Sequence, residues 1–131
     1  MAKEMIHPSN VHVAPDHILA CKVGNTVYIG GHGASGPDGK LVGKGDMEAQ
    51  ATQAFTNLEN ILKAAGAGLA DIVKLNIYLT EREHLLNMVE VRKKFFAERN
   101  APLPPGRTTV IVKSLGNPDS LIEIEGIAEI D

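Results

Sequence analysis

The order of helical and strand-like segments most constrains what this chain can fold into. Apolar residues recur at helical spacing after Asp46, a candidate N-cap, and stop at Gly66, while residues 81–99 predict a second helix. Short β-rich runs precede, separate and follow these two segments. The order ββαβαββ predicts an α+β fold in which two helices cover one face of a mixed sheet. The predicted strands are residues 18–23, 26–30, 73–79, 107–115 and 121–130, with a short edge strand at 4–7 as an option.

The two faces of this sheet are expected to differ. Two helices can cover only one face, and apolar residues supply it. The opposite face is too apolar to be exposed to solvent and too polar to be the core of a monomer, so we expect other subunits to cover it. The predicted helix-facing residues are Val27, Ile29, Val73, Leu75, Ile77, Val110, Val112, Ile122 and Ile124. The predicted opposite face carries Tyr28, Lys74, Asn76, Thr109, Ile111, Leu115, Leu121, Glu123, Glu125 and Ile127.

Size and composition narrow the class of protein. A chain of 131 residues with 44% apolar and 22% charged residues is expected to form one domain, residues 1–131. A net charge of −3 offers no basic surface for nucleic acid, and no run approaches the roughly 20 apolar residues of a membrane span. The single cysteine, Cys21, fits a reducing compartment, and we expect a cytoplasmic or organelle-matrix protein.

Glycine and histidine residues give weaker signals. Seven glycines lie between residues 30 and 45, where the backbone could approach a ligand, although a plain connecting loop would explain them equally well. Phosphate-binding glycine motifs are absent from this stretch. Five histidines are present without the spacing of metal ligands, so we expect no metal site.

Arg107 is a candidate for binding an anionic group. It follows the rigid Pro104-Pro105-Gly106 segment and opens a strand, so its guanidinium would be anchored there. A planar fork of donors binds a carboxylate bidentately, which a lysine cannot copy. A surface arginine or a structural salt bridge is the alternative interpretation.

Glu123 and Glu125 are candidates for proton transfer. They are two residues apart in an apolar strand and therefore point to the same face. A carboxylate desolvated there would have a raised pKa and could pass a proton near neutral pH. A cross-strand ion pair with Lys74 or Lys113 is the alternative for either glutamate, and the sequence does not decide which of the two carries a perturbed pKa.

Five motif blocks lie along the chain: GNTVYIGG at 24–31, MEAQATQAFTNLENILKAAG at 47–66, DIVKLNIYLT at 71–80, PPGRTTV at 104–110 and IEIEGIA at 122–128. In these blocks the chain resembles the YjgF/RidA family, and the resemblance extends nearly end to end. This resemblance implies a chorismate-mutase-like fold, a homotrimer whose sheets pack into a central β-barrel, and clefts between subunits as the functional sites. A trimer agrees with the mixed face inferred from the residues.

The resemblance also implies roles for individual residues. Arg107 matches the family arginine that holds the substrate carboxylate, and Glu123 matches the glutamate that orients or activates water. Backbone groups around Gly31 and Thr109 would complete the pocket. The implied activity is hydrolysis of a reactive imine or enamine acid, such as 2-iminopropanoate or 2-iminobutanoate, to a keto acid and ammonia without metal or organic cofactor.

Several positions depart from the family pattern. His17 stands where many deaminating members carry a tyrosine, and Gly30-Gly31-His32 replaces a serine-glycine-glutamine triplet. Thr109 replaces a cysteine, and Val89 replaces an asparagine of the second helix. His17 and His32 would still line the substrate pocket, but these changes leave the identity of the substrate open.

Two further functions compete with the deaminase. A non-catalytic trimer could bind small carboxylates through Arg107 and act as a sensor or regulatory protein. Ribonuclease activity, attached to some relatives, is less favoured because the chain is acidic and has only three Phe and two Tyr for base stacking.

Overall fold

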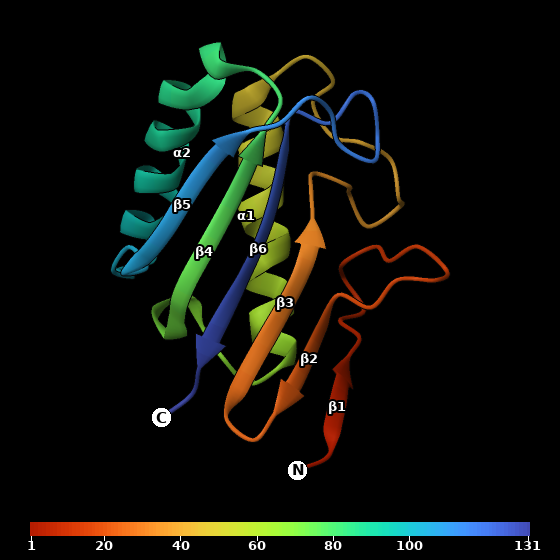
Figure 1. The fold of residues 1–131 in the computed structure, drawn as a ribbon, viewed down its shortest axis with the longest axis vertical. Helices are drawn as coiled ribbons and strands as arrows, with labels where there is room; N and C mark the ends of the chain where they lie inside the picture. The colour runs from red at the N-terminus through yellow and green to blue at the C-terminus, as the bar shows by residue number, and fades with distance from the viewer.

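A six-stranded mixed sheet forms one layer of the molecule and two helices form the other (Figure 1). The computed structural model describes all 131 residues. The α+β class and the two helices on one face are thereby confirmed. The strands are β1 (Lys3–Ile6), β2 (Ala20–Val23), β3 (Thr26–His32), β4 (Ile72–Leu79), β5 (Gly106–Ile111) and β6 (Ile122–Glu129). The helices are α1 (Met47–Ala64) and α2 (Leu85–Glu98), with short 3-10 turns η1 (Leu69–Asp71) and η2 (Arg82–His84).

The strands lie in the order β1-β2-β3-β6-β4-β5. All neighbours are antiparallel except β4 and β5, which are parallel and are joined through α2 as a crossover. The predicted turn between β2 and β3 forms at Gly24, whose φ of +58° a glycine adopts without strain. Because β5 forms one edge of the sheet, its outer side has no neighbour within the chain.

Local signals define the longer helix. The Asp46 side chain accepts a hydrogen bond from the Ala49 amide at 3.1 Å, as an N-cap does, and Gly66 follows the helix with φ +79°. The second helix is shorter than predicted, because residues 82–84 form the turn η2. Neither helix combines the length and the hydropathy that crossing a membrane requires.

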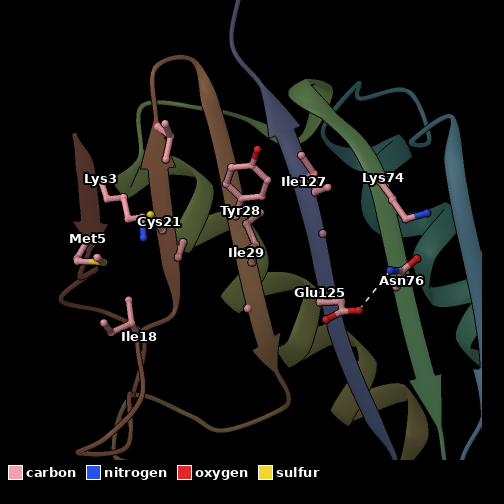
Figure 2. A pocket seen from close by; sticks show the side chains of 14 residues that line it. Lys3, Met5, Ile18, Cys21, Tyr28, Ile29, Lys74, Asn76, Glu125 and Ile127 are labelled. Carbon is pink, nitrogen blue, oxygen red and sulfur yellow. Dashed lines mark hydrogen bonds between the residues drawn. The ribbon is translucent and has the colours of Figure 1, made fainter. Parts of the chain in front are cut away.

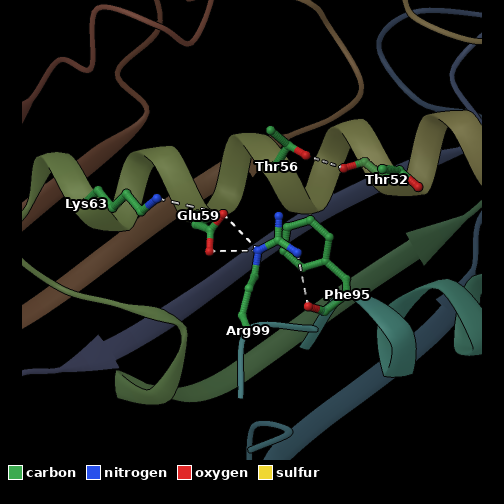
Figure 3. A network of polar contacts seen from close by, with 6 residues as sticks. All are labelled: Thr52, Thr56, Glu59, Lys63, Phe95 and Arg99. Atoms are coloured by element: carbon green, nitrogen blue, oxygen red, sulfur yellow. Dashed lines mark hydrogen bonds and ion pairs between the residues drawn. The ribbon is translucent and has the colours of Figure 1, made fainter. Parts of the chain in front are cut away.

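The helices pack on each other through aromatic rings and through one polar network. Phe55 of α1 lies 5.7 Å from Phe95 of α2, measured between ring centroids. Figure 3 shows Arg99, just after α2, reaching back to α1, where its Nε lies 3.0 and 2.9 Å from the two carboxylate oxygens of Glu59. The Arg99 guanidinium also lies 3.5 Å from the centroid of the Phe95 ring. These contacts stabilise the packing of the C-terminal end of α2 against α1.

A single cluster of 25 buried apolar residues fills the space between the helices and the sheet. Val73, Val110 and Val112, all predicted to face the helices, are not part of it, and Val73 is 40% exposed. The pairing of β4 with β6 shifts between Ile72 and Lys74, and this irregularity places Ile72 in the core instead. The prediction for Val73 was therefore wrong because a β-bulge changed the alternation.

The predicted alternation of β5 was wrong by one residue. Thr109 and Ile111 are in register with the buried Ile77 and Leu79, so they lie on the helix side rather than on the opposite face. Val110, predicted to face the helices, points to the face of the sheet that no helix covers, called the open face below, and is 41% exposed. The strand ends at Ile111, so Val112 and Leu115 fall outside it.

Candidate functional site

Arg107 lies at the start of the edge strand β5. Its Nη1 donates a hydrogen bond to the Pro104 carbonyl at 2.9 Å, so the Pro-Pro-Gly segment anchors the guanidinium as expected. The three ion pairs of the chain involve Lys44, Lys63 and Arg99, and none includes Arg107. The side chain is exposed, and its remaining donors are therefore available to an anionic ligand.

Glu123 lies in the interior strand β6, close to Gly31 of the neighbouring strand β3. A Cβ atom placed on Gly31 would lie 3.1 Å from both Cδ and Oε2 of Glu123, so the carboxylate fills the space that this glycine leaves. The Nε2 atom of His17 lies 3.2 Å from the Gly31 carbonyl. The structure therefore places Glu123 next to Gly31, and His17 lies beside the Gly31 backbone.

Glu125 differs from Glu123 in its hydrogen bonds. Its carboxylate accepts hydrogen bonds from the Tyr78 hydroxyl and from Asn76 Nδ2, the latter at 3.3 Å, whereas no side-chain hydrogen bond holds Glu123. Neither glutamate forms an ion pair with Lys74 or Lys113. The Glu125 carboxylate is thus already hydrogen-bonded to residues of the neighbouring strand, and Glu123 is the carboxylate that remains available to bind water or a ligand.

His32 lies below the surface, on the helix side of β3. It is 7% exposed, its Nδ1 lies 3.1 Å from the Gly30 carbonyl, and its Nε2 has no hydrogen-bond partner. Burial lowers the pKa of His32 below its ordinary value, so the ring is neutral at neutral pH. His32 lines, with His17 and Gly31, a small hollow of about 160 Å³.

The predicted site residues form two groups on opposite faces of the sheet. Arg107 is in register with the buried Leu75, so it shares the helix side with Thr109, whereas Glu123 is in register with Tyr78 on the open side. Arg107 and Glu123 lie two strands apart across the sheet and three residues apart along the strand direction. This offset corresponds to roughly 14 Å between their Cα atoms. Within one chain, a substrate of three or four carbons cannot contact both side chains.

The open face of the sheet carries a wide hollow of about 730 Å³ (Figure 2). Met5, Ile18 and Tyr28 line it, although 42%, 46% and 50% of their respective surfaces remain exposed. Such a gathering of exposed apolar side chains is unusual for a surface that faces water. The other lining residues are Lys3, Ala20, Cys21, Val23, Ile29, Gly30, Lys74, Asn76, Glu125, Gly126 and Ile127.

Sequence reasoning missed one charged residue, Arg92 of α2. It occupies a core-facing position of the helix, is 8% exposed, and its Nε has no hydrogen-bond partner. Burial lowers the pKa of Arg92, and the positive charge of Arg107 lowers it further. A positive charge in the apolar stripe of the helix was the signal that could have identified it.

The fold matches that of solved structures closely. The crystal structure of the YjgF gene product from Escherichia coli superimposes with a TM-score of 0.89 at 28% identity, covering 99% of this chain and 100% of that one. The family model described as Endoribonuclease L-PSP matches residues 11–130. The chain belongs to this family, the YjgF/RidA family, as its motif blocks indicated.

Curated relatives extend over comparable lengths. A RutC family protein of Pyrococcus abyssi is 36% identical over 132 residues, covering 98% of this chain and 98% of its own length. A protein of Dermatophagoides farinae named 2-iminobutanoate/2-iminopropanoate deaminase is 36% identical over 113 residues, covering 86% of this chain and 84% of its own. The names of these relatives therefore include one enzymatic activity, which is imine deamination.

Proposed function

We propose that this protein is a deaminase that hydrolyses reactive imine or enamine acids, such as 2-iminopropanoate or 2-iminobutanoate, to keto acids and ammonia. The observation that carries the proposal is that both residues the reaction needs have unused hydrogen-bonding capacity. Arg107 is anchored by one hydrogen bond and has no acidic partner, while Glu123 has no side-chain hydrogen bond. The activity named for the D. farinae relative agrees with this arrangement.

Arg107 would fix the substrate through its carboxylate. A guanidinium binds a carboxylate through two parallel N–H···O bonds, which orients the adjacent imine carbon. An enamine acid first tautomerises to its imine. The backbone around Gly31 would approach the substrate closely, because the glycine presents no side chain.

Glu123 would then guide the attacking water. The water oxygen bonds to the imine carbon while Glu123 accepts one of its protons and returns it to the nitrogen. The hydroxyl proton of the resulting carbinolamine then passes to the nitrogen as the C–N bond breaks and the C=O bond forms, so ammonia leaves and the keto acid remains. Every atom comes from the imine acid and one water molecule, and the balance requires no metal or organic cofactor.

The site would be assembled between the subunits of a homotrimer whose open sheet faces pack into a central barrel. Arg107 and Glu123 point to opposite faces of one sheet, so Arg107 of one subunit would meet Glu123 of another. The exposed apolar residues of the open face support an assembly that covers them. We expect light scattering to give three times the 14.0 kDa of one chain, and a monomer at micromolar concentration would contradict this assembly.

Keto-acid release from 2-iminopropanoate and 2-iminobutanoate generated in situ tests the function. We expect the wild type to accelerate release over buffer, and Arg107→Ala and Glu123→Gln to abolish the acceleration. Arg82→Ala and Glu81→Gln, which change exposed residues near η2, are matched controls and should retain full activity. No acceleration by the wild type would overturn the proposed activity on these two imines.

The same variants separate the deaminase from the two other functions. Glu123→Gln should lose turnover but retain affinity for a carboxylate ligand, whereas in a non-catalytic carboxylate-binding protein there is no turnover to lose. Cleavage of RNA by the wild type but not by Arg107→Ala would favour the ribonuclease that the family model's description names. The net charge of −3 makes that outcome unfavourable.

A further inference from the structure

The buried side of α2 contains one charge. The core-facing residues of this helix are Met88, Arg92, Phe95 and Phe96. Three of them are apolar, and Arg92 is nearly as inaccessible as they are, with 8% of its surface exposed. A guanidinium withdrawn from water is tolerated when acidic groups or hydrogen-bond acceptors compensate its charge.

No such compensation is present for Arg92. None of the three ion pairs in the chain includes it, and its buried Nε donates to no acceptor. The charged group that acts on it is another cation, Arg107, and the two lie on facing layers, since Arg107 is on the helix side of β5. Two guanidinium groups near each other without an acid form an arrangement that an anion would stabilise.

The environment of Arg107 fits a shared anion site. The Pro104 carbonyl occupies only one of its donors, and its side chain remains accessible from solvent. An anion can therefore reach Arg107 from solvent, and the effect of Arg107 on Arg92 indicates that the two positive charges lie near each other. A carboxylate bound at Arg107 alone would leave the second guanidinium unmatched, whereas a ligand with two carboxylates could supply one to each arginine.

We infer that Arg92 and Arg107 together form a binding site for a dianion, and that the preferred substrates are imine acids that carry a second carboxylate. This inference rests on the proposed function in taking Arg107 as the anchor for the carboxylate beside the imine. Arg92 then determines specificity by binding the carboxylate at the far end of the substrate. A net charge of −3 on the chain gives no general attraction for dianions, so a preference for them would come from this pair.

Ligand binding tests the inference without relying on turnover. Succinate and butanoate have four carbons each and differ by one carboxylate, and calorimetry at constant ionic strength gives both dissociation constants. We expect the wild type to bind succinate about tenfold more tightly or better, a difference of about 1.4 kcal/mol. Equal dissociation constants for the two ligands in the wild type would overturn the inference.

Substitutions then assign the preference to Arg92. Arg92→Met should bring the two dissociation constants within about twofold while leaving that for butanoate nearly unchanged, because Arg107 is intact. Arg92→Lys should retain part of the preference, since an ammonium keeps the charge without the bidentate geometry. Lys94→Met, an exposed position of the same helix, is the matched control and should bind both ligands as the wild type does. A succinate preference that survives Arg92→Met would exclude Arg92 from the site.

Folding and assembly are checked with the same variants. Methionine replaces an uncompensated buried ion by an apolar chain of similar length, so the melting temperature of Arg92→Met should be equal to or above that of the wild type. If an acidic residue of another subunit neutralises Arg92, Arg92→Met would weaken the oligomer and the wild type would show no preference for succinate. That result would overturn the inference.

Turnover of two imines distinguishes this inference from the proposed function. Iminosuccinate and 2-iminobutanoate can be generated in situ from aspartate and 2-aminobutanoate by amino-acid oxidases. Faster hydrolysis of iminosuccinate, reversed by Arg92→Met, would support both proposals. An Arg92-dependent succinate preference without hydrolysis of either imine would leave the dianion site standing and overturn the deaminase. Hydrolysis of 2-iminobutanoate alone, without a succinate preference, would support the deaminase and overturn the dianion site.

Discussion

The carboxylate of Glu123 lies against the bare backbone of Gly31 on the neighbouring strand. A Cβ atom on residue 31 would be 3.1 Å from Cδ and Oε2 of Glu123, which is too close without movement of the glutamate. Gly31 does not have a positive φ, so space rather than backbone conformation accounts for the glycine. The position of the proposed water-binding carboxylate therefore depends on the absence of a side chain at residue 31.

Substituting Gly31 by alanine should impair catalysis more than folding. The added methyl would push the flexible Glu123 side chain away by a few tenths of an ångström, and misplacing a catalytic group by about 1 Å can lower a rate roughly a hundredfold. We therefore expect kcat/KM for imine hydrolysis to fall by about tenfold, less than for a 1 Å displacement, with little change in melting temperature. Gly116→Ala, where a Cβ would meet no atom within 4 Å, is the matched control. Equal activities of the two variants would contradict the role of this contact.

Asn57 of α1 should be essential for holding the loop that follows β3. This buried side chain donates from Nδ2 to the carbonyls of Gly33 and Ser35, both at 2.9 Å. Asn57→Ala leaves both carbonyls without that partner, and we expect a loss of about 2 kcal/mol in unfolding free energy by denaturant titration. Asn60→Ala removes an amide of the same helix that forms no side-chain hydrogen bond, and its stability should be within about 0.5 kcal/mol of the wild type. A loss as large for Asn60 would refute the assignment.

The Tyr78 hydroxyl should titrate at unusually high pH. Its hydrogen bond to Glu125, then burial, then the charges of Glu125 and Glu123 raise the pKa of Tyr78 above the ordinary value of 10.0. Because the folded state holds this proton more tightly than the unfolded chain, the contact stabilises the fold fully below about pH 10. That stabilisation is lost as the pH rises through the pKa of the folded state.

An ultraviolet titration of phenolate formation measures this directly. Tyr78 is one of two tyrosines, so a Tyr28→Phe background reports on Tyr78 alone. Adding Glu125→Gln removes the negative charge and should move the titration midpoint to lower pH. Glu129→Gln, at the far end of β6, should leave it unchanged. A midpoint that Glu125→Gln does not move would show that Glu125 is not the cause.

Elements set by neighbouring residues could be predicted from the sequence. The β2–β3 turn at Gly24, the Asp46 cap and the helix end at Gly66 all formed where their local signals placed them. The exposed positions of Val73 and Val110 could not be predicted, because a bulge in β4 and the register of β5 arise from strand pairing across the fold.

The candidate site could be predicted as a set of residues but not as an arrangement. The Gly31–Glu123 contact depends on β3 pairing with β6, strands about ninety residues apart along the chain. The placement of Arg107 and Glu123 on opposite faces follows from registers that an alternating pattern does not define. Arg92 was missed because an arginine in a helix is ordinarily a solvated residue, and its burial arises only when α2 packs on the sheet.

The contact between Arg99 and Glu59 should stabilise the packing of α2 on α1. Arg99 combines hydrogen bonds to both Glu59 oxygens with a position over the Phe95 ring, so it contributes more than an isolated surface ion pair. We expect Arg99→Ala to lower the unfolding free energy by about 1 kcal/mol, and Arg99→Lys to recover less than half because lysine lacks the planar fork. Lys63→Ala removes a contact of 4.0 Å to the same glutamate and should change stability little. If Arg99→Ala and Lys63→Ala had equal effects, charge alone would explain the contact and the stacking on Phe95 would contribute nothing.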